Sequence, residues 1–274
     1  MSGKASATES WSVAVWNLDE GRSAKARSWK IVEELQATVA LLNEARVPTG
    51  GLRGQIMGGE STVGRDDKIR KWSTAIFSPH KLHDPEDVWT TAWGKRRAPL
   101  ANTRAGSWTA AVVSIPDVGE VTAVALYGLL DERSDASVHR SLSDLTPLFE
   151  DRRYGERLVI GGDLNTWTGW AAGSRHLARD EAVLQRIEAF GFVDCLVAAQ
   201  KSDRGPLAGC PCRFGDACTH TRTRLDRNNP EIPYQMDYLF ASPALAAGLI
   251  TCEALDMGEN NPSDHFPIRA TFAK

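Results

Sequence analysis

The sequence lacks a long uninterrupted apolar run. No segment approaches the roughly 18 apolar residues that a membrane-spanning helix requires, and the N-terminal stretch MSGKASATES has no apolar core of the kind found in a secretory leader. These absences argue against a membrane-spanning or exported protein. We therefore expect a soluble, cytoplasmic protein.

Cysteine is also scarce, with five residues among 274. Because no secretion signal implies an oxidising compartment, a disulfide framework is disfavoured. Cys195 and Cys252 lie in apolar runs and are expected to be buried, unreactive thiols. The other three cysteines fall within one short motif, which is considered below.

Nothing in the composition calls for a second globular domain. The chain is 42% hydrophobic, and a chain of this length can bury roughly three quarters of the surface that it exposes when unfolded. A single α/β unit of this size is ordinary. We expect a flexible N-terminal segment over residues 1–10 and one folded domain over residues 11–274.

Three short acidic motifs stand out in the C-terminal half. They are GGDLN (Gly161 to Asn165), QMDYLFAS (Gln235 to Ser242) and NPSDHFP (Asn261 to Pro267). Each joins an apolar run to a carboxylate accompanied by Asn, Tyr or His, a set suited to metal-assisted attack on a phosphate ester. Two upstream runs, VAVWNLDEG and TVALLNEA, supply matching polar residues at their ends: Asn17, Asp19 and Glu44.

With these five motifs in this order, the chain resembles the endonuclease/exonuclease/phosphatase superfamily, whose members include apurinic endonucleases, pancreatic deoxyribonuclease and lipid or inositol phosphatases. The resemblance extends from about Trp11 to Phe272. It implies a four-layer α/β/β/α sandwich, in which helices cover two packed mixed β-sheets. Periodicity alone is compatible with this fold but does not distinguish it from other α/β layers.

Runs of aliphatic and β-branched residues predict eight strands. They are Trp11–Trp16, Thr38–Leu42, Ser73–Phe77, Trp108–Ile115, Val121–Tyr127, Arg157–Gly161, Gln235–Phe240 and Phe266–Phe272. Motif residues recur at the ends of these strands. A twisted sheet or sandwich would therefore gather Asn17, Glu44, Tyr127 and Asp163 along one rim.

Helical spacing of apolar residues predicts three helices. The first spans Ser23 to Gln36 and starts at a Ser cap, and the second spans Arg175 to Phe190 and ends before Gly191. A third is expected between Asp135 and Glu150, although Pro147 leaves its last turn open.

The motif carboxylates predict a divalent cation. The net charge is −3, and removing Asp19, Glu44, Asp163, Asp237 and Asp264 from the count leaves +2 for the rest of the chain. Such an acidic cluster would repel a phosphate unless a cation neutralised it. Glu44 is the best candidate ligand for Mg²⁺ (or Mn²⁺), which prefers carboxylates and retains several waters. The resemblance implies that Asp19 and Asp264 add to that site or flank it.

Asp163 is the candidate that orients and deprotonates the attacking water. Asn165 lies two residues along, on the same side of an extended segment, and can donate to the same water or phosphate. His265 is expected to donate to a phosphate oxygen while Asp237 holds it protonated. An Asp or Asn at a strand end can also be a simple turn former or cap.

The resemblance implies two further roles. Asn17 holds a ligand or phosphate oxygen, and Tyr127 matches a position where relatives place a Tyr or His donor, with a core tyrosine as the alternative. Asn43 stands where many relatives carry Gln. Residues Gly128 to Leu130 lack the Asn found a few positions later in apurinic endonucleases, which weakens assignment to that subclass.

A second cluster, CPCRFGDACTH, places Cys210, Cys212, Cys218 and His220 within eleven residues. Three thiolates and an imidazole form a tetrahedral donor set for structural Zn²⁺, although the CxC spacing is tighter than the usual CxxC knuckle. We expect a structural Zn²⁺ in this loop. Reduced free thiols and a disulfide are the alternatives.

Basic residues and tryptophans gather in two segments. Pro48 to Lys71 is Gly-rich and carries Arg53, Arg65, Lys68, Arg70 and Lys71, and a second group near Trp89 and Trp93 contains Lys95, Arg96, Arg97 and Arg104. Such loops suit a nucleic-acid backbone and stacked bases, and they equally suit a solvated surface. Trp167 and Trp170 follow GDLN closely and are expected in the core, with a place for one of them in the substrate cleft as the alternative.

We therefore expect a Mg²⁺-dependent phosphodiester hydrolase, most simply a nuclease with a nucleic-acid substrate. The alternative enzyme is a phosphatase or phosphodiesterase for an inositol phosphate, lipid headgroup or nucleotide. A non-catalytic nucleic-acid-binding module is disfavoured, because the acid, base and metal set is intact. No protein partner can be inferred.

Overall fold

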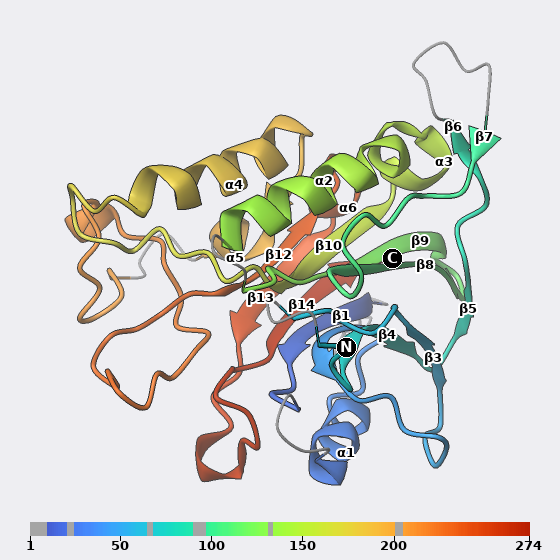
Figure 1. The fold of residues 1–274 in the computed structure, drawn as a ribbon, viewed down its shortest axis with the longest axis horizontal. Coiled ribbons are helices and arrows are strands. Elements are labelled where there is room, and N and C mark those ends of the chain that lie inside the picture. The colour runs from blue at the N-terminus through green and yellow to red at the C-terminus, as the bar shows by residue number, and fades with distance from the viewer. Residues whose placement is uncertain (1–9, 21–24, 65–67, 90–96, 131–133, 201–204) are drawn as a thin grey trace, which may run out of the picture.

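Apolar runs separated by polar turns form two mixed β-sheets (Figure 1). The structure is a computed structural model, and it describes residues 10–20, 25–64, 68–89, 97–130, 134–200 and 205–274. The basic and aromatic candidates Arg65, Trp93, Lys95 and Arg96 lie outside these described residues.

The first sheet has six strands, in the order β13 (Leu249–Ala254), β14 (Ile268–Ala273), β1 (Ser10–Asn17), β2 (Val39–Ala45), β4 (Ser73–Ser78) and β3 (Gln55–Gly58). Strands β1 and β2 are parallel, and the other neighbours are antiparallel. Ser10 pairs with Ala273. Residue 10 therefore belongs to the sheet, and the N-terminal segment expected over residues 1–10 is shorter; residues 1–9 lie outside the described part of the chain.

The second sheet also has six strands, in the order β11 (Val193–Asp194), β12 (Asp237–Ala241), β10 (Leu158–Asp163), β9 (Gly119–Leu126), β8 (Trp108–Ile115) and β5 (Lys81–His83). Strands β9 and β10 are parallel, and the other neighbours are antiparallel. A small separate hairpin joins β6 (Val88–Trp89) to β7 (Arg97–Ala98). Each large sheet therefore contains a single parallel pair.

Helices cover the outer faces of both sheets (Figure 1). α1 (Ala26–Glu34) lies on the first sheet, and α2 (Ser134–Glu150) and α4 (Leu177–Ala189) lie on the second. Short helical turns complete the described elements: α3 (Arg152–Gly155), α5 (Cys195–Ala198), η1 (Gly215–Ala217), α6 (Pro243–Ala246) and η2 (Gly258–Asn260). The predicted four-layer α/β/β/α sandwich is confirmed.

Three apolar layers hold the four structural layers together. Residues such as Val15, Leu41 and Leu239 fill the space between the sheets. Trp16 and Trp29 pack between the first sheet and α1, while a third cluster joins the second sheet to α2 and α4. Each fully buried large side chain contributes about 1.5–3 kcal/mol. The two sheets therefore form a rigid base for polar groups at their edges.

All eight predicted strands are present, with small shifts at their ends. The last begins at Ile268 instead of Phe266, because Pro267 has no amide hydrogen for the ladder and the Phe266 amide donates to Thr223 O outside the sheet. The short strands β3, β5, β6, β7 and β11, and the partly exposed edge strand β13, were not predicted. Their apolar patterns are too brief or too diluted to be recognised.

The predicted helices are also present. α1 begins at Ala26 after Lys25, which makes no side-chain cap bond, so the predicted span from a Ser23 cap was too long. Ser23 itself is not among the described residues. α2 continues through Pro147 to Glu150. None of the helices in the described ranges combines the length and apolar character that a bilayer crossing requires.

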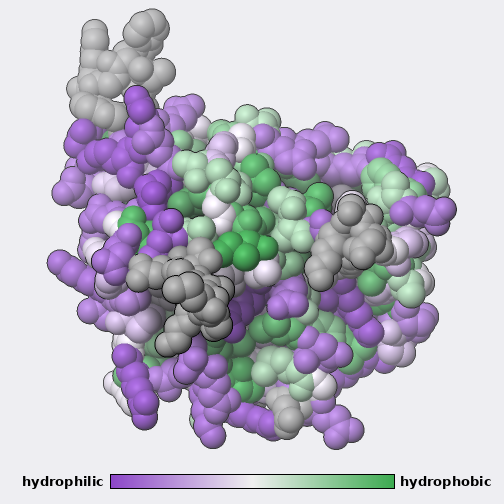
Figure 2. All heavy atoms as spheres, turned by 180° about the vertical axis from the view of Figure 1, so that it is seen from behind, coloured by the Kyte–Doolittle hydropathy of each residue, from purple (hydrophilic) through white to green (hydrophobic). Residues whose placement is uncertain are grey.

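Seen from the side opposite to Figure 1, hydrophilic residues occupy most of the periphery, and hydrophobic residues gather near the middle of the face (Figure 2).

Candidate active site

The ends of the two parallel strand pairs meet at one edge of the sandwich. Asn17 ends β1, Glu44 lies near the end of β2, Tyr127 follows β9 and Asp163 ends β10. The Asn17 amide donates to Asp163 Oδ2 at 2.9 Å and to Glu44 Oε1 at 3.4 Å, and the Tyr127 hydroxyl donates to the same Glu44 oxygen at 2.8 Å. The structure therefore brings all four predicted rim residues into direct contact.

Asp163 is held by three N–H groups and is almost fully buried, with 2% exposure. Besides the Asn17 bond, its Oδ1 accepts the Asn165 backbone N–H at 2.9 Å and its Oδ2 accepts the Asn165 side-chain amide at 3.2 Å. Burial raises the pKa of the Asp163 carboxyl; the nearby His265 opposes this shift and Asp237 adds to it. The carboxyl is therefore more basic than an exposed aspartate.

His265 lies among three carboxylates. Its Nδ1 is 2.8 Å from Asp237 Oδ2, and its Nε2 is 3.8 Å from Asp163 Oδ2 and 3.8 Å from Asp264 Oδ1. Since an ionised carboxylate only accepts hydrogen bonds, Nδ1 carries a proton. Burial lowers the pKa of the imidazole, but the charges of Asp237, Asp163 and Asp264 outweigh burial and raise it overall. The structure thus favours an imidazolium at neutral pH.

Asp237 anchors this histidine from β12, next to Asp163 in the antiparallel register. Its side chain has no exposure to solvent, and its backbone N–H donates to Thr223 Oγ1 at 3.0 Å. The second carboxylate oxygen, Oδ1, is buried and has no hydrogen-bond partner among the described residues. An uncompensated buried acceptor is costly, so the proton on His265 is the main group that stabilises Asp237.

Asn43 ties the two sheets together directly beneath Asp163. From β2, its amide nitrogen donates to Leu126 O at 3.2 Å, and its Oδ1 accepts the Asp163 backbone N–H at 2.7 Å. A Cβ atom on Gly162 would lie 2.6 Å from Asn43 Oδ1 and 1.8 Å from Leu126 O. Only glycine fits at position 162. The Asn43 amide noted in the sequence therefore positions the end of β10 that carries Asp163.

Three polar residues near Asp163 adopt left-handed backbone conformations, with φ of 49° at Asp19, 47° at Glu44 and 48° at Asn165. Such conformations in non-glycine residues cost on the order of 1–3 kcal/mol each and concentrate at functional sites. Asp19 is fixed by its N–H bond to Asn17 Oδ1 at 3.0 Å. Next to it, the fully buried Glu20 accepts the backbone N–H of Lys25 and of Arg46, which fixes its own position.

A cavity of about 440 Å³ opens above these groups. Five carboxylates and three basic side chains line it, so it holds an excess of negative charge: Asp19, Glu44, Asp163, Asp226 and Asp264 against Arg224, Arg227 and His265. Asn17, Tyr127, Leu130, Asn165 and Asn228 complete the lining. A divalent cation would offset this excess.

Arg224 and the segment from Asp226 to Asn228 were not identified from the sequence. Arg224 pairs through its backbone with Tyr234 and His265 and lies 3.4 Å from Asp264 Oδ2. Burial lowers the pKa of its guanidinium, but Asp264 and Asp163 raise it overall, so it is a permanent cation at the cavity. The alternation of Thr and Arg in THTRTR, typical of an extended segment, is the signal that could have located it.

The predicted metal ligands line the cavity without forming one tight group. Asp19 pairs with Lys25 at 2.8 Å, Asp264 with Arg224, and Glu44 with Tyr127. Among the described residues, Asp163, Asp237 and His265 form a tight acidic group. Their donor atoms all lie within 4.8 Å of one another. Both carboxylates of this group already bind His265 or amide groups. The carboxylates of Glu44, Asp264 and Asp19, which also line the cavity, therefore fit a hydrated hard cation better than Asp163 and Asp237 do.

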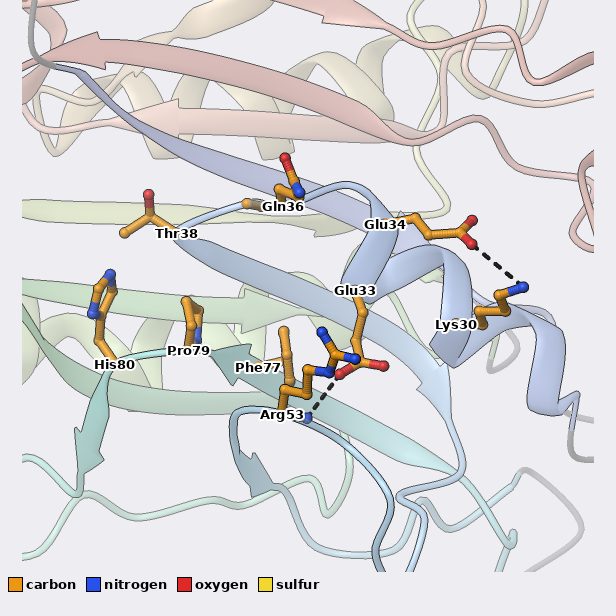
Figure 3. Close-up of a pocket in the computed structure, with 10 residues that line it drawn as sticks. Lys30, Glu33, Glu34, Gln36, Thr38, Arg53, Phe77, Pro79 and His80 are labelled. Atoms are coloured by element: carbon orange, nitrogen blue, oxygen red, sulfur yellow. Dashed lines mark hydrogen bonds and ion pairs between the residues drawn. The ribbon is translucent and has the colours of Figure 1, made fainter.

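The cavity in Figure 3, about 640 Å³, lies at the opposite end of the first sheet. It is lined by residues that precede β2, such as Thr38, and by residues that follow β4, such as His80. Thr38 is about 20 Å along β2 from Glu44, at roughly 3.3 Å per residue. Arg53 lies here, with its backbone N–H bonded to Glu33 at 2.7 Å, and therefore not at the active-site rim.

Part of the basic sequence does lie beside the active site. Trp72 packs edge-on against Tyr127, with ring centroids 5.4 Å apart. Trp72 directly follows the basic segment that contains Lys68, Arg70 and Lys71. Lys68 and Lys71 are exposed. The loop containing Arg104 reaches the same place, because Tyr127 N–H donates to Ser107 O at 2.7 Å.

The remaining aromatic and thiol candidates are structural. Trp167 is buried, as predicted, and packs on Trp170 and Tyr234. Trp170 is half-buried and donates to Asp180 Oδ2 at 2.8 Å. Cys195 is buried and Cys252 half-buried, and burial raises the pKa of both thiols. Both cysteines are therefore poor nucleophiles, as expected.

Comparison with known proteins supports the fold. No protein-family model matches the sequence, and no curated protein matches it. Among solved structures, an AP endonuclease from Leishmania major is 14% identical with a TM-score of 0.63, covering 97% of this chain and 88% of that one. A 3′ phosphatase from Neisseria, bound to a product DNA hairpin, is 15% identical with a TM-score of 0.63, covering 96% and 100%.

A third solved structure carries the family description itself. An endonuclease/exonuclease/phosphatase protein from Beutenbergia cavernae is 17% identical with a TM-score of 0.61, covering 96% of this chain and 71% of that one. These similarities extend over nearly the whole chain, as the motifs do. The chain therefore has the fold of the endonuclease/exonuclease/phosphatase superfamily.

Proposed function

We propose that this chain is a divalent-metal-dependent phosphodiesterase whose substrate is a nucleic acid. The observation that carries the proposal is the buried His265, which lies between Asp237 and Asp163 at a cavity that also contains Glu44 and Arg224. This arrangement offers a base, an acid and a fixed cation within one small volume. Those are the groups that in-line displacement at phosphorus requires.

Asp163 is the group that takes a proton from the attacking water. Its raised pKa makes it a stronger base than a solvated aspartate. The amides of Asn17 and Asn165 hold its carboxylate from different directions, so that the oxygen lone pairs point in a fixed direction. Such preorganisation reduces the reorganisation needed in the transition state.

His265 supplies the opposite charge. As an imidazolium it can donate from Nε2 to a phosphate oxygen while Nδ1 remains bonded to Asp237. Arg224 adds a second positive group at the same cavity and can pair with a nonbridging oxygen. Tyr127 stays protonated, because burial and the charges of Glu44 and Asp163 raise its pKa well above the usual value.

Glu44, with Asp264 and Asp19 beside it, would hold Mg²⁺ or Mn²⁺. Among the described residues, the second oxygen of Glu44 has no hydrogen-bond partner, whereas the first is fixed by Tyr127 and Asn17. A cation bound there neutralises phosphate charge and stabilises the departing oxygen. The excess of carboxylates over basic groups at the cavity supports this assignment.

Two observations favour a nucleic acid over a small phosphoester. Trp72 and the exposed Lys68 and Lys71 extend from the Tyr127 side of the cavity, where they can contact a polyanionic backbone and a base. In addition, solved structures with this fold include an AP endonuclease and a phosphatase bound to a DNA hairpin.

A substrate panel tests the proposal. Purified protein is incubated with single-stranded, double-stranded and abasic DNA, with RNA, and with phosphoinositides and nucleotides, with and without EDTA. We expect cleavage of at least one nucleic acid, loss of cleavage in EDTA and recovery with Mg²⁺ or Mn²⁺.

The matched control is Asp117→Asn, which changes an exposed turn residue far from the cavity and should leave the rate unchanged. Full turnover by demetallated protein would overturn the metal-dependent mechanism. Turnover restricted to phosphoinositides or nucleotides would overturn the nucleic-acid assignment, and binding without turnover would overturn the assignment as an enzyme.

A further inference from the structure

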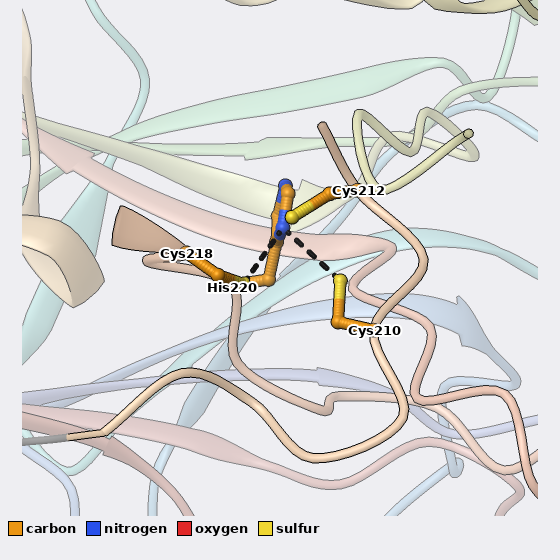
Figure 4. Close-up of side chains that lie close together, drawn as sticks. All are labelled: Cys210, Cys212, Cys218 and His220. Atoms are coloured by element: carbon orange, nitrogen blue, oxygen red, sulfur yellow. Dashed lines mark hydrogen bonds between the residues drawn. The ribbon is translucent and has the colours of Figure 1, made fainter. Parts of the chain in front are cut away.

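The Cys/His motif folds into a compact set of four donors (Figure 4). The sulfur atoms of Cys210, Cys212 and Cys218 and one ring nitrogen of His220 all lie within 4.8 Å of one another. His220 Nδ1 is 3.4 Å from the sulfur of Cys210 and 3.4 Å from that of Cys218. Cys218 and His220 are buried, and Cys210 and Cys212 are half-buried.

These separations match a tetrahedral zinc site. With Zn–S and Zn–N bonds of about 2.3 and 2.0–2.1 Å, tetrahedral ligands have S···N distances of about 3.6 Å and S···S distances of about 3.8 Å. The observed S···N distances of 3.4 Å fall close to this value. Three soft thiolates and one imidazole favour zinc over the hard cation suited to the acidic cavity.

The other side of His220 is fixed as well. Its Nε2 lies 2.9 Å from Thr168 Oγ1, so a histidine that binds a cation through Nδ1 would carry its proton on Nε2 and donate it to this hydroxyl. Such an outer bond sets the tautomer and ring orientation of metal-binding histidines. Thr168 follows the GDLN motif by three residues, which connects the Cys/His cluster to the strand end that carries Asp163.

The cluster lies in a long connection that has little structure of its own. Between α5 and β12, the described residues 205–236 contain only the short turn η1 as a regular element. A connection of this length without regular structure is uncommon in a compact domain. Its far end delivers Arg224 and Asp226 to the active-site cavity, and the Thr221 N–H bond to Gln235 fixes its junction with β12.

We propose that Cys210, Cys212, Cys218 and His220 bind one structural Zn²⁺ that cross-links this connection and holds it against the Thr168 segment. The site is distinct from the proposed catalytic metal site. It has no open coordination position, because four protein ligands complete the tetrahedron. Its existence does not depend on the proposed phosphodiesterase activity.

Metal analysis of the full chain, expressed with zinc and purified without chelator, tests the proposal first. We expect about one zinc per chain, together with protection of the three motif thiols from a thiol reagent in the native protein. Exchange of zinc for Co²⁺ should give thiolate-to-cobalt charge-transfer absorption. A zinc content near zero with all motif thiols reactive, or a disulfide found by mass spectrometry, would overturn the proposal.

Two substitutions localise the metal. Cys212→Ser and His220→Ala should each release most of the zinc and lower the unfolding temperature, since the binding energy of a structural zinc is largely folding energy. The matched control is Cys252→Ser, on the edge strand β13, which should keep one zinc. Equal zinc content in all three variants would contradict the ligand assignment. If the two ligand variants do not fold, the wild-type metal content and cobalt spectrum still decide.

Discussion

The molecule contains two donor clusters that are built in opposite ways. The acidic cluster combines Asp163 from the end of β10 with Asp237 from the start of β12. Its third member, His265, lies about 100 residues after Asp163 in the sequence. The Cys/His cluster takes all four donors from eleven consecutive residues of one connection. The first cluster therefore depends on the packing of two sheets, whereas the second depends on local chain geometry.

The clusters also differ in how their charge is compensated. Asp163 and Asp237 share the positive charge of His265, and the Asn17 amide donates a hydrogen bond to Asp163, so these groups can remain in place without an ion. The Cys/His cluster holds three sulfur atoms and a single imidazole within 4.8 Å of one another, so one imidazole could not offset the charge of three thiolates. We infer that the acidic cluster is preorganised for chemistry and that the Cys/His cluster needs its ion to be stable.

The largest expected effect is on turnover. Asp163→Asn and His265→Ala should each lower the rate by at least about 10²-fold, the scale of losing one general-base or electrostatic element. Because both groups act on one transition state, the double variant should lose less than the product of the single effects. Rates near that of the wild type in either single variant would remove that residue from the mechanism.

The next effect is on metal activation. Glu44→Gln keeps the hydrogen bonds from Tyr127 and Asn17 possible but removes the charge that attracts the cation. We expect the Mg²⁺ concentration for half-maximal rate to rise by about tenfold or more, since even indirect partners of a metal are worth 10–100-fold in affinity. Metal titration of the rate measures this shift. An unchanged midpoint would place the cation elsewhere.

A smaller effect is expected on stability beneath the acidic cluster. Asn43→Ala would leave Leu126 O and the Asp163 backbone N–H without their partner, at a cost of about 1–3 kcal/mol for each buried group left unsatisfied. Chemical denaturation should detect the loss. Thr146→Ala, which removes a hydroxyl bonded only within α2, is the comparison substitution and should cost less.

The smallest expected effect is the influence of one cluster on the other. Asp163→Asn should keep about one zinc per chain, because the Thr168 contact to His220 does not involve the carboxylate. Metal analysis of this variant checks the expectation. Loss of zinc together with loss of activity would show that the two clusters form one unit and are not independent of each other.

Much of the active site could be predicted from the sequence because its residues end strands whose apolar runs are long. Asn17, Glu44, Tyr127 and Asp163 follow such runs, and the order of the motifs indicated the fold. The Cys/His donors were found because they are close in the sequence. In both cases the signal was local.

Arg224 and the sheet-to-sheet role of Asn43 were not predicted, and the reasons are physical. Arg224 lies in a connection where the alternation THTRTR indicates at most an extended segment, and nothing local indicates which part of the fold that segment reaches. Asn43 bonds to Leu126 and Asp163, which are 83 and 120 residues away in the sequence. The approach of Trp72 to Tyr127 likewise depends on how two loops meet in space.

The position of β14 within the first sheet has a consequence for biosynthesis. β14 lies between β13 and β1, so an early and a late segment of the chain are neighbours. His265 lies three residues before the start of this strand. A nascent chain that has already formed β1, β2 and β10 still lacks its acid and its Arg224 cation, since domains form as the chain emerges from the N-terminus. The residues proposed as acid and cation are therefore synthesised after Asn17, Glu44 and Asp163, three other polar groups of the cavity.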